Sequence, residues 1–167
     1  MKEAVLVIIK PDGISKKLVG SVISRFERSS MDIIAMKAKR TSKELIEAHY
    51  HHIKGQSFFE GVVSYFLGKL HKENKLILTV FYGKDAIKKC RKIAGETNPE
   101  DADPDSIRGS YGRITTEGVF ENVVHVSSTK YDSEREIKLW FEPGDVVIDL
   151  YPTKTKKVSG HKVRMWK

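Results

Sequence analysis

The stretch Asn122-Val123-Val124-His125-Val126-Ser127-Ser128 is the most informative part of this 167-residue chain. Its apolar residues predict a short strand that delivers a histidine to the strand end, with hydroxyl side chains directly after it. A carboxylate, Glu136, follows in the next predicted helix. An imidazole attacks only when it is neutral, and it benefits from a partner that fixes its tautomer. The spacing is therefore compatible with a histidine nucleophile, although a structural histidine at a strand end has the same local pattern.

Strand and helix patterns alternate outward from this stretch. The β-branched run Ala4–Ile9 predicts a buried strand that ends at the turn Lys10-Pro11-Asp12-Gly13. In a second strand, Ile34, Met36 and Ala38 alternate with lysines, which predicts one apolar face. Strands are predicted at residues 33–40, 75–81, 119–126 and 146–150, and helices at 19–28, 43–52, 58–70, 85–94 and 131–141.

The order of these elements favours an α+β fold. A split βαβ arrangement fits it best, with helices on one face of an antiparallel sheet. The stretch from Gly95 to about Phe120 is rich in Gly, Pro, Asp and Thr and shows no regular pattern. Such a long irregular segment is uncommon inside a compact domain unless it binds something, so it is a candidate ligand loop.

Composition indicates one ordinary globular domain. Apolar residues make up 40% of the chain and charged residues 31%. No apolar run approaches the roughly 20 residues that span a bilayer, and the first residues lack the apolar core of a signal peptide. We therefore expect no membrane partner. The single cysteine, Cys90, cannot form an internal disulfide, which favours a reducing, cytoplasmic location.

The positive charge is concentrated at the C-terminal end. Six of the positive charges lie between Thr153 and Lys167, where no Asp or Glu occurs. Without them the formal net charge falls from +8 to +2, which argues against a nucleic-acid partner for the rest of the chain. We expect residues 1–152 to form the main domain and residues 153–167 a basic arm, either solvated or packed on a neighbouring subunit.

Several basic and hydroxyl side chains are candidates for phosphate binding. Lys10 stands at the end of the first strand, and Arg91 precedes the long loop that contains Thr97 and Arg108. An arginine fork meets phosphate oxygens in pairs, and a cation on a strand end is held rigidly. An exposed turn lysine is the plainer alternative for Lys10. The acidic residues between positions 100 and 105 weaken any simple basic patch.

Familiar nucleotide and metal motifs are absent from the sequence. It contains no GxxxxGK[ST] loop and no GxGxxG after a strand. His49, His51 and His52 lie close together, but no cysteine or carboxylate at ligand spacing joins them, so we expect no metal held by the protein itself. Phe58 could stack on a base, with core packing as the more common role of such an aromatic residue.

Four motifs nevertheless occur together in an order that resembles the nucleoside diphosphate kinase family. Leu139-Trp140-Phe141 also matches the family helix after the active-site histidine, and the resemblance runs from about residue 3 to about residue 150. The motifs are Ile9-Lys10-Pro11-Asp12-Gly13, Gly95-Glu96-Thr97-Asn98-Pro99, Ile107-Arg108-Gly109, and Asn122-Val123-Val124-His125 with Ser127 and Glu136. Four separated motifs in this order are specific, whereas each one alone is weak.

This resemblance implies a fold, a reaction and partners. The fold would be a ferredoxin-like βαββαβ sandwich, with an antiparallel sheet and helices packed on it. The reaction would be transfer of the γ-phosphate of ATP or another nucleoside triphosphate to a nucleoside diphosphate. It would proceed by a ping-pong mechanism through phosphohistidine, with broad base tolerance. The resemblance also implies Mg²⁺ on the nucleotide phosphates and a homo-oligomer of a size that the sequence does not specify.

The same resemblance implies a role for each matching residue. His125 would be the nucleophile, oriented by Glu136 directly or through Ser127. Because phosphoryl transfer depends on positioning and on cations near the phosphate oxygens, polar and basic residues would do most of the remaining work. Lys10, Tyr50 and Asn122 would meet the transferred phosphate or the ribose; Arg91, Thr97 and Arg108 would hold the other phosphates; and Phe58 would stack on the base, with Val119 nearby.

The chain departs from the family pattern at a few positions. Val126 stands where the family has glycine, and Ser128 where an acidic residue is usual. A β-branched residue does not easily adopt a positive φ, so we expect an altered backbone at Val126 or altered access to His125. The connections 113–121 and 68–75 are longer than usual by a few residues. We expect these changes to tune activity without abolishing it.

Two other functions are compatible with the sequence. A nucleotide-responsive binding module would keep the fold without efficient turnover, and Val126 is its only support. A nucleic-acid-binding protein would use the basic arm, and it would show strong salt dependence that disappears when residues 153–167 are deleted.

Overall fold

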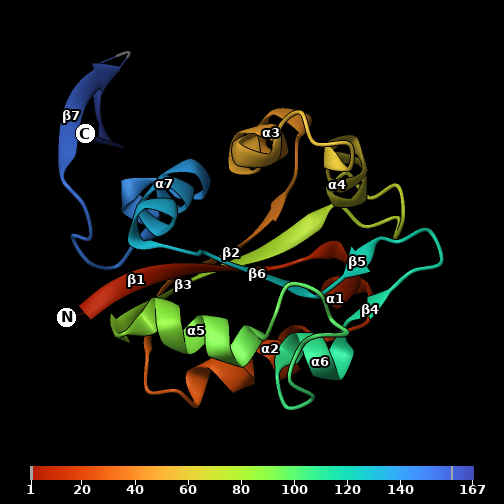
Figure 1. The fold of residues 1–167 in the computed structure, drawn as a ribbon. Coiled ribbons are helices and arrows are strands. Elements are labelled where there is room, and N and C mark those ends of the chain that lie inside the picture. Colours follow the sequence, from red (N-terminus) through yellow and green to blue (C-terminus); the bar gives the residue numbers. More distant parts are fainter. Residues whose placement is uncertain (1, 159) are drawn as a thin grey trace.

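A four-stranded antiparallel sheet forms the centre of the computed structural model, which describes residues 2–158 and 160–167 (Figure 1). Its strands lie in the order β2-β3-β1-β6, with β1 between β3 and β6. Residues 5–9 of β1 are at most 2% exposed. This central position explains the unbroken apolar run, since both faces of β1 are covered. The strands are β1 (Lys2–Ile9), β2 (Asp32–Arg40), β3 (Lys75–Lys84) and β6 (Val124–Val126).

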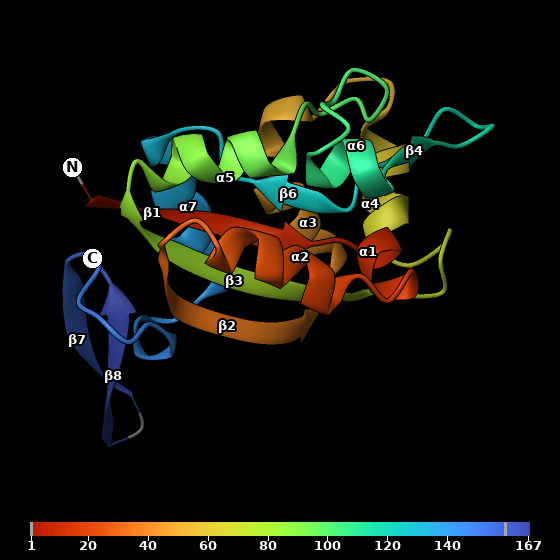
Figure 2. The same cartoon turned by 90° about the horizontal axis from the view of Figure 1, so that it is seen from below.

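Helices cover both faces of this sheet, so the prediction of helices on one face was wrong. Leu6 and Ile8 of β1 face one hydrophobic core, while Val5, Val7 and Ile9 face a second. Each core is closed by its own set of helices (Figure 1, Figure 2). The first set is α3 (Lys43–His49), α4 (Phe59–Phe66) and α7 (Lys130–Trp140); the second is α2 (Val19–Glu27), α5 (Ala86–Ala94) and α6 (Ile107–Tyr111).

The α+β prediction and the βαββαβ order are confirmed by β1, α2, β2, β3, α5 and β6. Short elements connect these parts of the fold. They are α1 (Pro11–Ser15), the 3-10 helices η1 (His51–Ile53) and η2 (Pro143–Asp145), and the two-residue strands β4 (Arg113–Ile114) and β5 (Phe120–Glu121). The turn predicted after β1 is thus helical, with Pro11 at its first position, where a missing N–H costs nothing.

Four other local predictions were wrong. No strand forms at 146–150, although the Val147 amide donates to the Ile34 carbonyl oxygen at 3.0 Å. The strand predicted at 119–126 is interrupted and becomes β5 and β6, and the irregular stretch before it contains α6. Met36 is 45% exposed because a bulge between Ile33 and Ala35 shifts the register of β2. A bulge adds one residue, which moves the following side chains to the opposite face.

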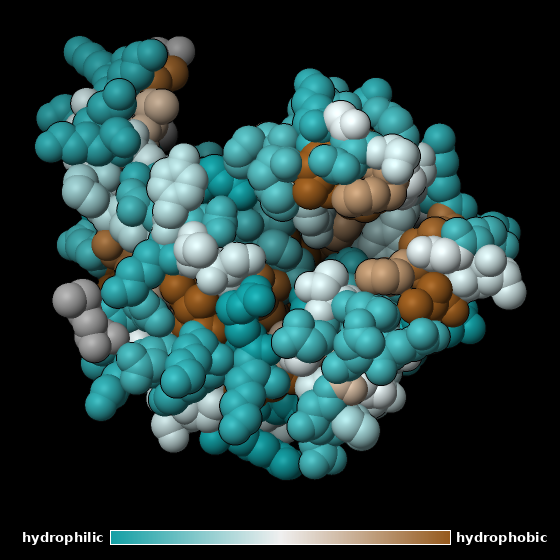
Figure 3. All heavy atoms as spheres, in the orientation of Figure 1, coloured by the Kyte–Doolittle hydropathy of each residue, from teal (hydrophilic) through white to brown (hydrophobic). Residues whose placement is uncertain are grey.

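The basic arm folds into a β-hairpin of β7 (Thr153–Val158) and β8 (His161–Trp166). Its base rests on the main body, where the Trp166 indole N–H donates to the Phe141 carbonyl oxygen at 2.8 Å. The Trp166 ring also packs against Tyr151, with ring centroids 5.7 Å apart. Beyond this base the hairpin extends away from the sheet, and its visible surface is mainly hydrophilic (Figure 1, Figure 3). Among the helices of the described residues, none is both long enough and apolar enough to span a membrane.

Candidate active site

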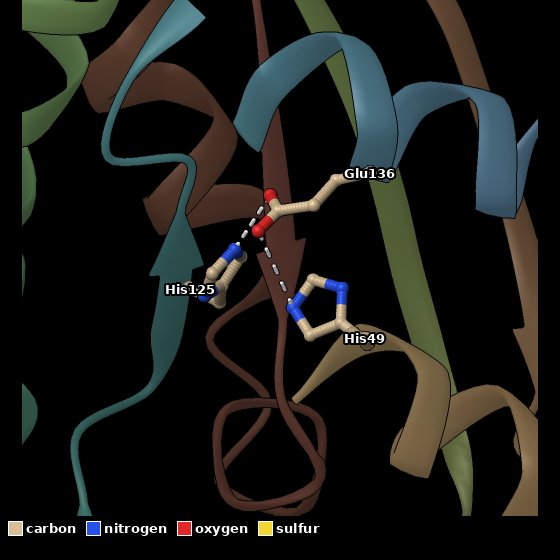
Figure 4. Close-up of side chains that lie close together, drawn as sticks. All are labelled: His49, His125 and Glu136. Carbon is tan, nitrogen blue, oxygen red and sulfur yellow. Dashed lines mark hydrogen bonds and ion pairs between the residues drawn. The ribbon is translucent and has the colours of Figure 1, made fainter. Parts of the chain in front are cut away.

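His125 lies in the middle of β6, opposite Ile8 of β1, and its side chain is 15% exposed. Strand pairing thus fixes the backbone of His125 against the most deeply buried strand of the fold. The molecular surface is hollowed beneath α3 and α4 on the face shown in Figure 3. Figure 4 shows that side chains from α3 and α7 approach His125 on this side of the sheet.

Glu136 on α7 is the direct partner of His125. Nε2 of His125 lies 2.9 Å from Oε2 of Glu136, and the Ser127 hydroxyl donates to the same oxygen at 2.6 Å. Burial alone would raise the pKa of Glu136, but His125 and Ser127 outweigh it and bring the pKa to about 2. The carboxylate is therefore charged and accepts a hydrogen bond from the Nε2–H of His125. This tautomer leaves Nδ1 of His125 with a free lone pair.

The backbone next to His125 is held in an unusual conformation at Val123. Its φ is +66°, a region that β-branched residues rarely adopt. Asp12 accepts a hydrogen bond from the Val123 amide at 3.0 Å, and the Lys10 amide donates to the Val123 oxygen at 2.8 Å. A Cβ on Gly13 would lie only 2.9 Å from Ile9 and 3.0 Å from Val123. Lys10, Asp12 and Gly13, directly after β1, therefore fix the segment that leads to His125.

Val126 does not cause the backbone change that we expected. Val126 continues strand β6, pairs with Val7 and is 3% exposed within the second core. Residues with positive φ include Val123 but not Val126. A valine fits this extended, buried position well, and His125 keeps its partner and its exposed edge.

Lys10, Asn122 and Thr97 form a chain of hydrogen bonds beside the histidine strand. The Lys10 ammonium donates to Oδ1 of Asn122 at 2.6 Å, and Nδ2 of Asn122 donates to the Thr97 carbonyl oxygen at 2.6 Å. Burial lowers the pKa of Lys10 to about 8, a drop that Asp12 limits. Lys10 is only 8% exposed, so it is not the exposed turn lysine that was the plainer alternative.

Arg108 and Arg91 are placed differently. Arg108 is 8% exposed and donates to the carbonyl oxygens of Gly95 and Val124 at 2.8 and 3.0 Å. Its Nε atom has no partner among the described residues, and burial lowers its pKa to about 10. Arg91 lies on the exposed side of α5 and donates to the Ser128 hydroxyl at 3.4 Å. The structure thus anchors Arg108 at the histidine strand and leaves Arg91 at the rim.

Three aromatic or apolar candidate residues lie on or beneath α3 and α4. Tyr50 directly follows α3, and its ring centroid lies 6.0 Å from that of His125. Burial raises the pKa of Tyr50 above its ordinary value, so its hydroxyl stays protonated. Phe58 precedes α4 and is 55% exposed, while Val119 packs against the core beneath α3 and α4. An aromatic ring this exposed is available to stack on a ligand.

Sequence reasoning missed His49 as part of this site. His49 is 1% exposed, and its ring packs edge-on against that of His125 with centroids 4.4 Å apart (Figure 4). The Trp140 indole N–H donates to Nδ1 of His49 at 3.0 Å. Burial and the neighbouring His125 hold the pKa of His49 well below its usual range, so the ring is neutral. Its position directly before Tyr50 was the available signal.

The trio of His49, His125 and Glu136 has ligand atoms within 4.8 Å of one another. A bound metal would need free lone pairs on both Nε2 atoms. Trp140 occupies the lone pair on Nδ1 of His49, so Nε2 of that ring holds the proton, and Nε2 of His125 donates to Glu136. The arrangement is therefore a hydrogen-bonded group and not a ready metal site.

The two long connections meet at Glu121, which sequence reasoning also missed. Glu121 is 1% exposed and pairs with Lys16 at 3.0 Å, with Arg113 at 2.7 Å and with His71 at 3.3 Å. His71 belongs to one long connection, and Arg113 to the other. The extra residues therefore form one unit joined by a buried carboxylate next to Asn122.

Comparisons with known proteins agree with this geometry. The family model for nucleoside diphosphate kinase matches residues 3–146. The chain belongs to the nucleoside diphosphate kinase family. A nucleoside diphosphate kinase of Pyrococcus furiosus is 40% identical over 144 residues, which is 86% of each chain.

Solved structures of nucleoside diphosphate kinases give the same result. One from Halobacterium salinarum, in complex with CDP, has a TM-score of 0.80 at 31% identity and covers 89% of this chain and 93% of its own. One from Borrelia burgdorferi, a transition-state mimic with bound vanadate and ADP, has a TM-score of 0.79 at 28% identity. The match covers 88% of this chain and 91% of the Borrelia chain. The fold and the ping-pong transfer of a γ-phosphate from a nucleoside triphosphate to a nucleoside diphosphate are therefore those of a nucleoside diphosphate kinase.

Proposed function

We propose that His125 is the residue that carries the phosphoryl group, and that it does so on Nδ1. The observation that supports this most directly is the hydrogen bond between Nε2 and Glu136 at 2.9 Å. It fixes the proton on Nε2 and leaves the Nδ1 lone pair as the nucleophile. The binding-module alternative loses its support, because Val126 lies in regular strand structure.

Atoms and charge balance in this step without loss of a proton from the ring. The Nδ1 lone pair forms a bond to the γ-phosphorus, and the bond from that phosphorus to the β–γ bridging oxygen breaks. The nucleoside diphosphate leaves with that electron pair. The His125 ring gains positive charge while Nε2 keeps its proton, and the Glu136 carboxylate balances that charge. The second nucleoside diphosphate reverses the step.

The remaining predicted residues are proposed to position the nucleotide. Lys10 and Asn122 are already bonded to each other beside β6, and Lys10 is the buried cation for the transferred phosphate. Arg108 offers its unpartnered Nε, and Arg91 approaches from the rim. The remaining contacts are assigned to Thr97 and Tyr50 for phosphate and ribose, to Ser127 for orienting Glu136, and to Phe58 and Val119 for the base. Stacking reads the face of a base and not its edge, which fits broad base tolerance.

Mg²⁺ is proposed to arrive on the nucleotide. The phosphate side of the site presents Lys10, Arg108 and the Asn122 amide, while Asp12 is already used by Tyr65 and Val123. Mg²⁺ is commonly held through substrate phosphates with few protein ligands, and this donor set fits that mode. When bound, the ion would neutralise charge on the phosphate oxygens.

The phosphohistidine proposal is tested by intact-mass spectrometry at alkaline pH after mixing the protein with ATP and Mg²⁺. We expect one added phosphoryl group in the wild type and in His51→Ala, a matched change of an exposed histidine. We expect none in His125→Ala, and ADP should discharge the adduct. An adduct that persists in His125→Ala would contradict the assignment.

Assembly, location and the division of the chain are further parts of this proposal. A homo-oligomer is supported by the edge strand β2, which exposes Met36. A reducing, cytoplasmic location is supported by Cys90, a buried free thiol. Residues 1–152 would act as the catalytic domain and 153–167 as an accessory arm. Light scattering on the purified full chain would report the number of subunits.

A further inference from the structure

His49 is a deeply buried ionisable group that the reaction above does not use, and its ring lies directly against that of His125. It ends α3, and its side chain is 1% exposed. Tyr50, His125 and Trp140 surround its ring, with centroid distances of 4.6, 4.4 and 5.8 Å. A polar ring is costly to bury unless its nitrogens find partners, so its two nitrogen atoms decide what it does.

The protonation state of His49 follows from one hydrogen bond. An indole N–H can only donate, and Trp140 donates to Nδ1 of His49 at 3.0 Å. Nδ1 must therefore present its lone pair, and the single proton of the neutral ring sits on Nε2. Trp140 is itself 1% exposed, which keeps this bond away from water.

The Nε2 proton of His49 points at the catalytic carboxylate. Nε2 lies 4.0 Å from Oε1 of Glu136 and has no hydrogen-bond partner among the described residues. The other oxygen, Oε2, already accepts from His125 and Ser127. Among the described residues, Oε1 accepts only a long hydrogen bond of 3.3 Å from Arg135. A small rotation of the Glu136 side chain would bring its free lone pairs within reach of His49.

We propose that His49 is a positioning residue whose Nε2–H donates to Oε1 of Glu136 during phosphoryl transfer, and that Trp140 sets the tautomer that makes this possible. The proposal rests on the assignment of His125 as the nucleophile. When the His125 ring becomes positive, Glu136 must stay charged and aimed at it. A neutral N–H donor stabilises that carboxylate without adding a second cation 4.4 Å from the first.

The charged and titratable groups around His49 favour this neutral role. Glu136 and Arg135 face it from α7, His125 from β6, and Tyr50 and His52 from the end of α3 and from η1. Burial, His125, Arg135 and His52 all act against its protonation, and only Glu136 acts for it. A ring this strongly held neutral offers a fixed N–H at every pH at which the enzyme works.

Three variants separate the parts of this proposal. His49→Phe keeps a ring and removes the donor, so we expect His125 phosphorylation to slow about tenfold to hundredfold. His49→Gln keeps an amide N–H and should recover part of that loss. Trp140→Phe keeps an aromatic ring at this position and removes the bond that sets the tautomer. His51→Phe changes an exposed histidine of the same segment and serves as the matched control.

The readouts distinguish positioning from simple structural support. Rapid-quench measurement should show a lower phosphorylation rate at an unchanged half-saturating ATP concentration, because the buried His49 is proposed to act through Glu136. In Trp140→Phe the rate should fall more steeply at acidic pH than in the wild type, because His49 can then take up a proton. Nitrogen-15 NMR of the wild-type imidazoles should show His49 as the Nε2–H tautomer across pH 6 to 9 (about the working range).

Either of two results would overturn the proposal. One is a proton on Nδ1 of His49 in the wild type. The other is a wild-type rate and pH profile in the folded variants that lack the donor or the tautomer bond. If His49→Phe does not fold, Trp140→Phe and the wild-type NMR still decide the question. A wild-type chain that is never phosphorylated would instead refute the assignment of His125. The NMR result on the His49 tautomer does not depend on that assignment.

Discussion

At the scale of single residues, burial and polar neighbours together set the protonation states of this site. It lowers the pKa of Lys10 to about 8 and holds that of His49 well below its usual range. Glu136 is also buried, yet its hydrogen bonds bring its pKa to about 2 and keep it charged. The site therefore combines a fixed anion behind the nucleophile with a cation that is only partly protonated at mildly alkaline pH.

A pH dependence follows from the lowered pKa of Lys10. The free enzyme loses this positive charge as pH rises through about 8, so kcat/KM should fall above that pH. Bound phosphate favours the charged lysine, so the fall in kcat should come at higher pH than the fall in kcat/KM. Steady-state kinetics between pH 6 and 10 (about two units either side of the transition) would measure both.

The charge-preserving variant Lys10→Arg provides the control for that profile. Its guanidinium stays charged over the whole range. Any alkaline fall in kcat/KM should therefore shift to higher pH, even if the overall rate is lower. An identical alkaline limb in wild type and variant would show that another group titrates there.

At the scale of elements, buried polar contacts fix the loops that sequence patterns could not place. Arg25 of α2 donates to the Ser110 hydroxyl and to the Asp105 carbonyl oxygen, which attaches the loop around α6 to the second layer of helices. Glu121 joins the two long connections in the same way. The long irregular stretch is thus organised by its contacts and not by a repeating pattern.

The Glu121 cluster should contribute measurably to stability. Removing its charge by Glu121→Gln leaves Lys16, Arg113 and His71 without their shared partner, and we expect a loss of about 1–3 kcal/mol in the free energy of unfolding at neutral pH. Glu117→Gln, at an exposed position in the same connection, should change stability by less than about 0.5 kcal/mol. Urea unfolding of the three proteins would measure these differences.

The same contribution should depend on pH with a defined sign. Burial opposes ionisation of Glu121, but Arg113 and Lys16 bring its pKa down from 4.5 to about 2. The stabilisation is therefore fully present above about pH 4.5 and is lost as pH falls through about 2. A gap between wild type and Glu121→Gln that stays constant down to the lower end of this range would contradict the ionic account.

The terminal hairpin should be dispensable for catalysis. Deleting residues 153–167 removes the Trp166 bond to Phe141, worth about 1 kcal/mol net, and leaves the groups around His125 untouched. We expect kcat/KM within about twofold of the full chain and a melting temperature lower by about 2–4 °C. Loss of turnover in a truncated chain with intact near-ultraviolet circular dichroism would show that the arm takes part in the reaction.

At the scale of the whole molecule, the sheet holds the site between two separate cores. Groups from both of its sides converge on β6: Glu136 and His49 from one side, and Arg108 from the other. A nucleotide held by Arg108 from one side and by Tyr50 and Phe58 from the other, as proposed, would tie the layers together. Its binding should therefore stabilise the folded state as a unit.

This stabilisation can be predicted from mass action. ADP at 100 times its dissociation constant should add about 2.7 kcal/mol, which corresponds to about 5–11 °C in melting temperature for a chain of this size. His125→Ala should keep this shift, because it removes the nucleophile and not the phosphate contacts. Arg108→Ala should reduce it at the same ADP concentration. Differential scanning fluorimetry would show whether the two variants separate in this way.

The sequence by itself determined the order of the six elements that form the βαββαβ core, because hydrophobic periodicity and cap residues are local signals. It also determined the fold class and the family through four motifs whose order is specific, and it supplied the site residues that are proposed above. His125, Glu136, Ser127, Lys10 and Asn122 do lie together in the structure. Their meeting was predictable because the motifs place them in or directly beside regular elements, with Lys10 directly after β1, His125 in β6 and Glu136 in α7.

Only the tertiary structure decided which surfaces those elements cover and which neighbours the site residues meet. The apolar run in β1 does not reveal that both of its faces carry helices, and the alternation in β2 does not reveal the bulge that exposes Met36. His49 and Glu121 have partners that are distant in the sequence. Trp140 lies 91 residues from His49, and His71 and Lys16 lie 50 and 105 residues from Glu121. Such contacts arise from packing between distant segments, for which a single sequence carries no local signal.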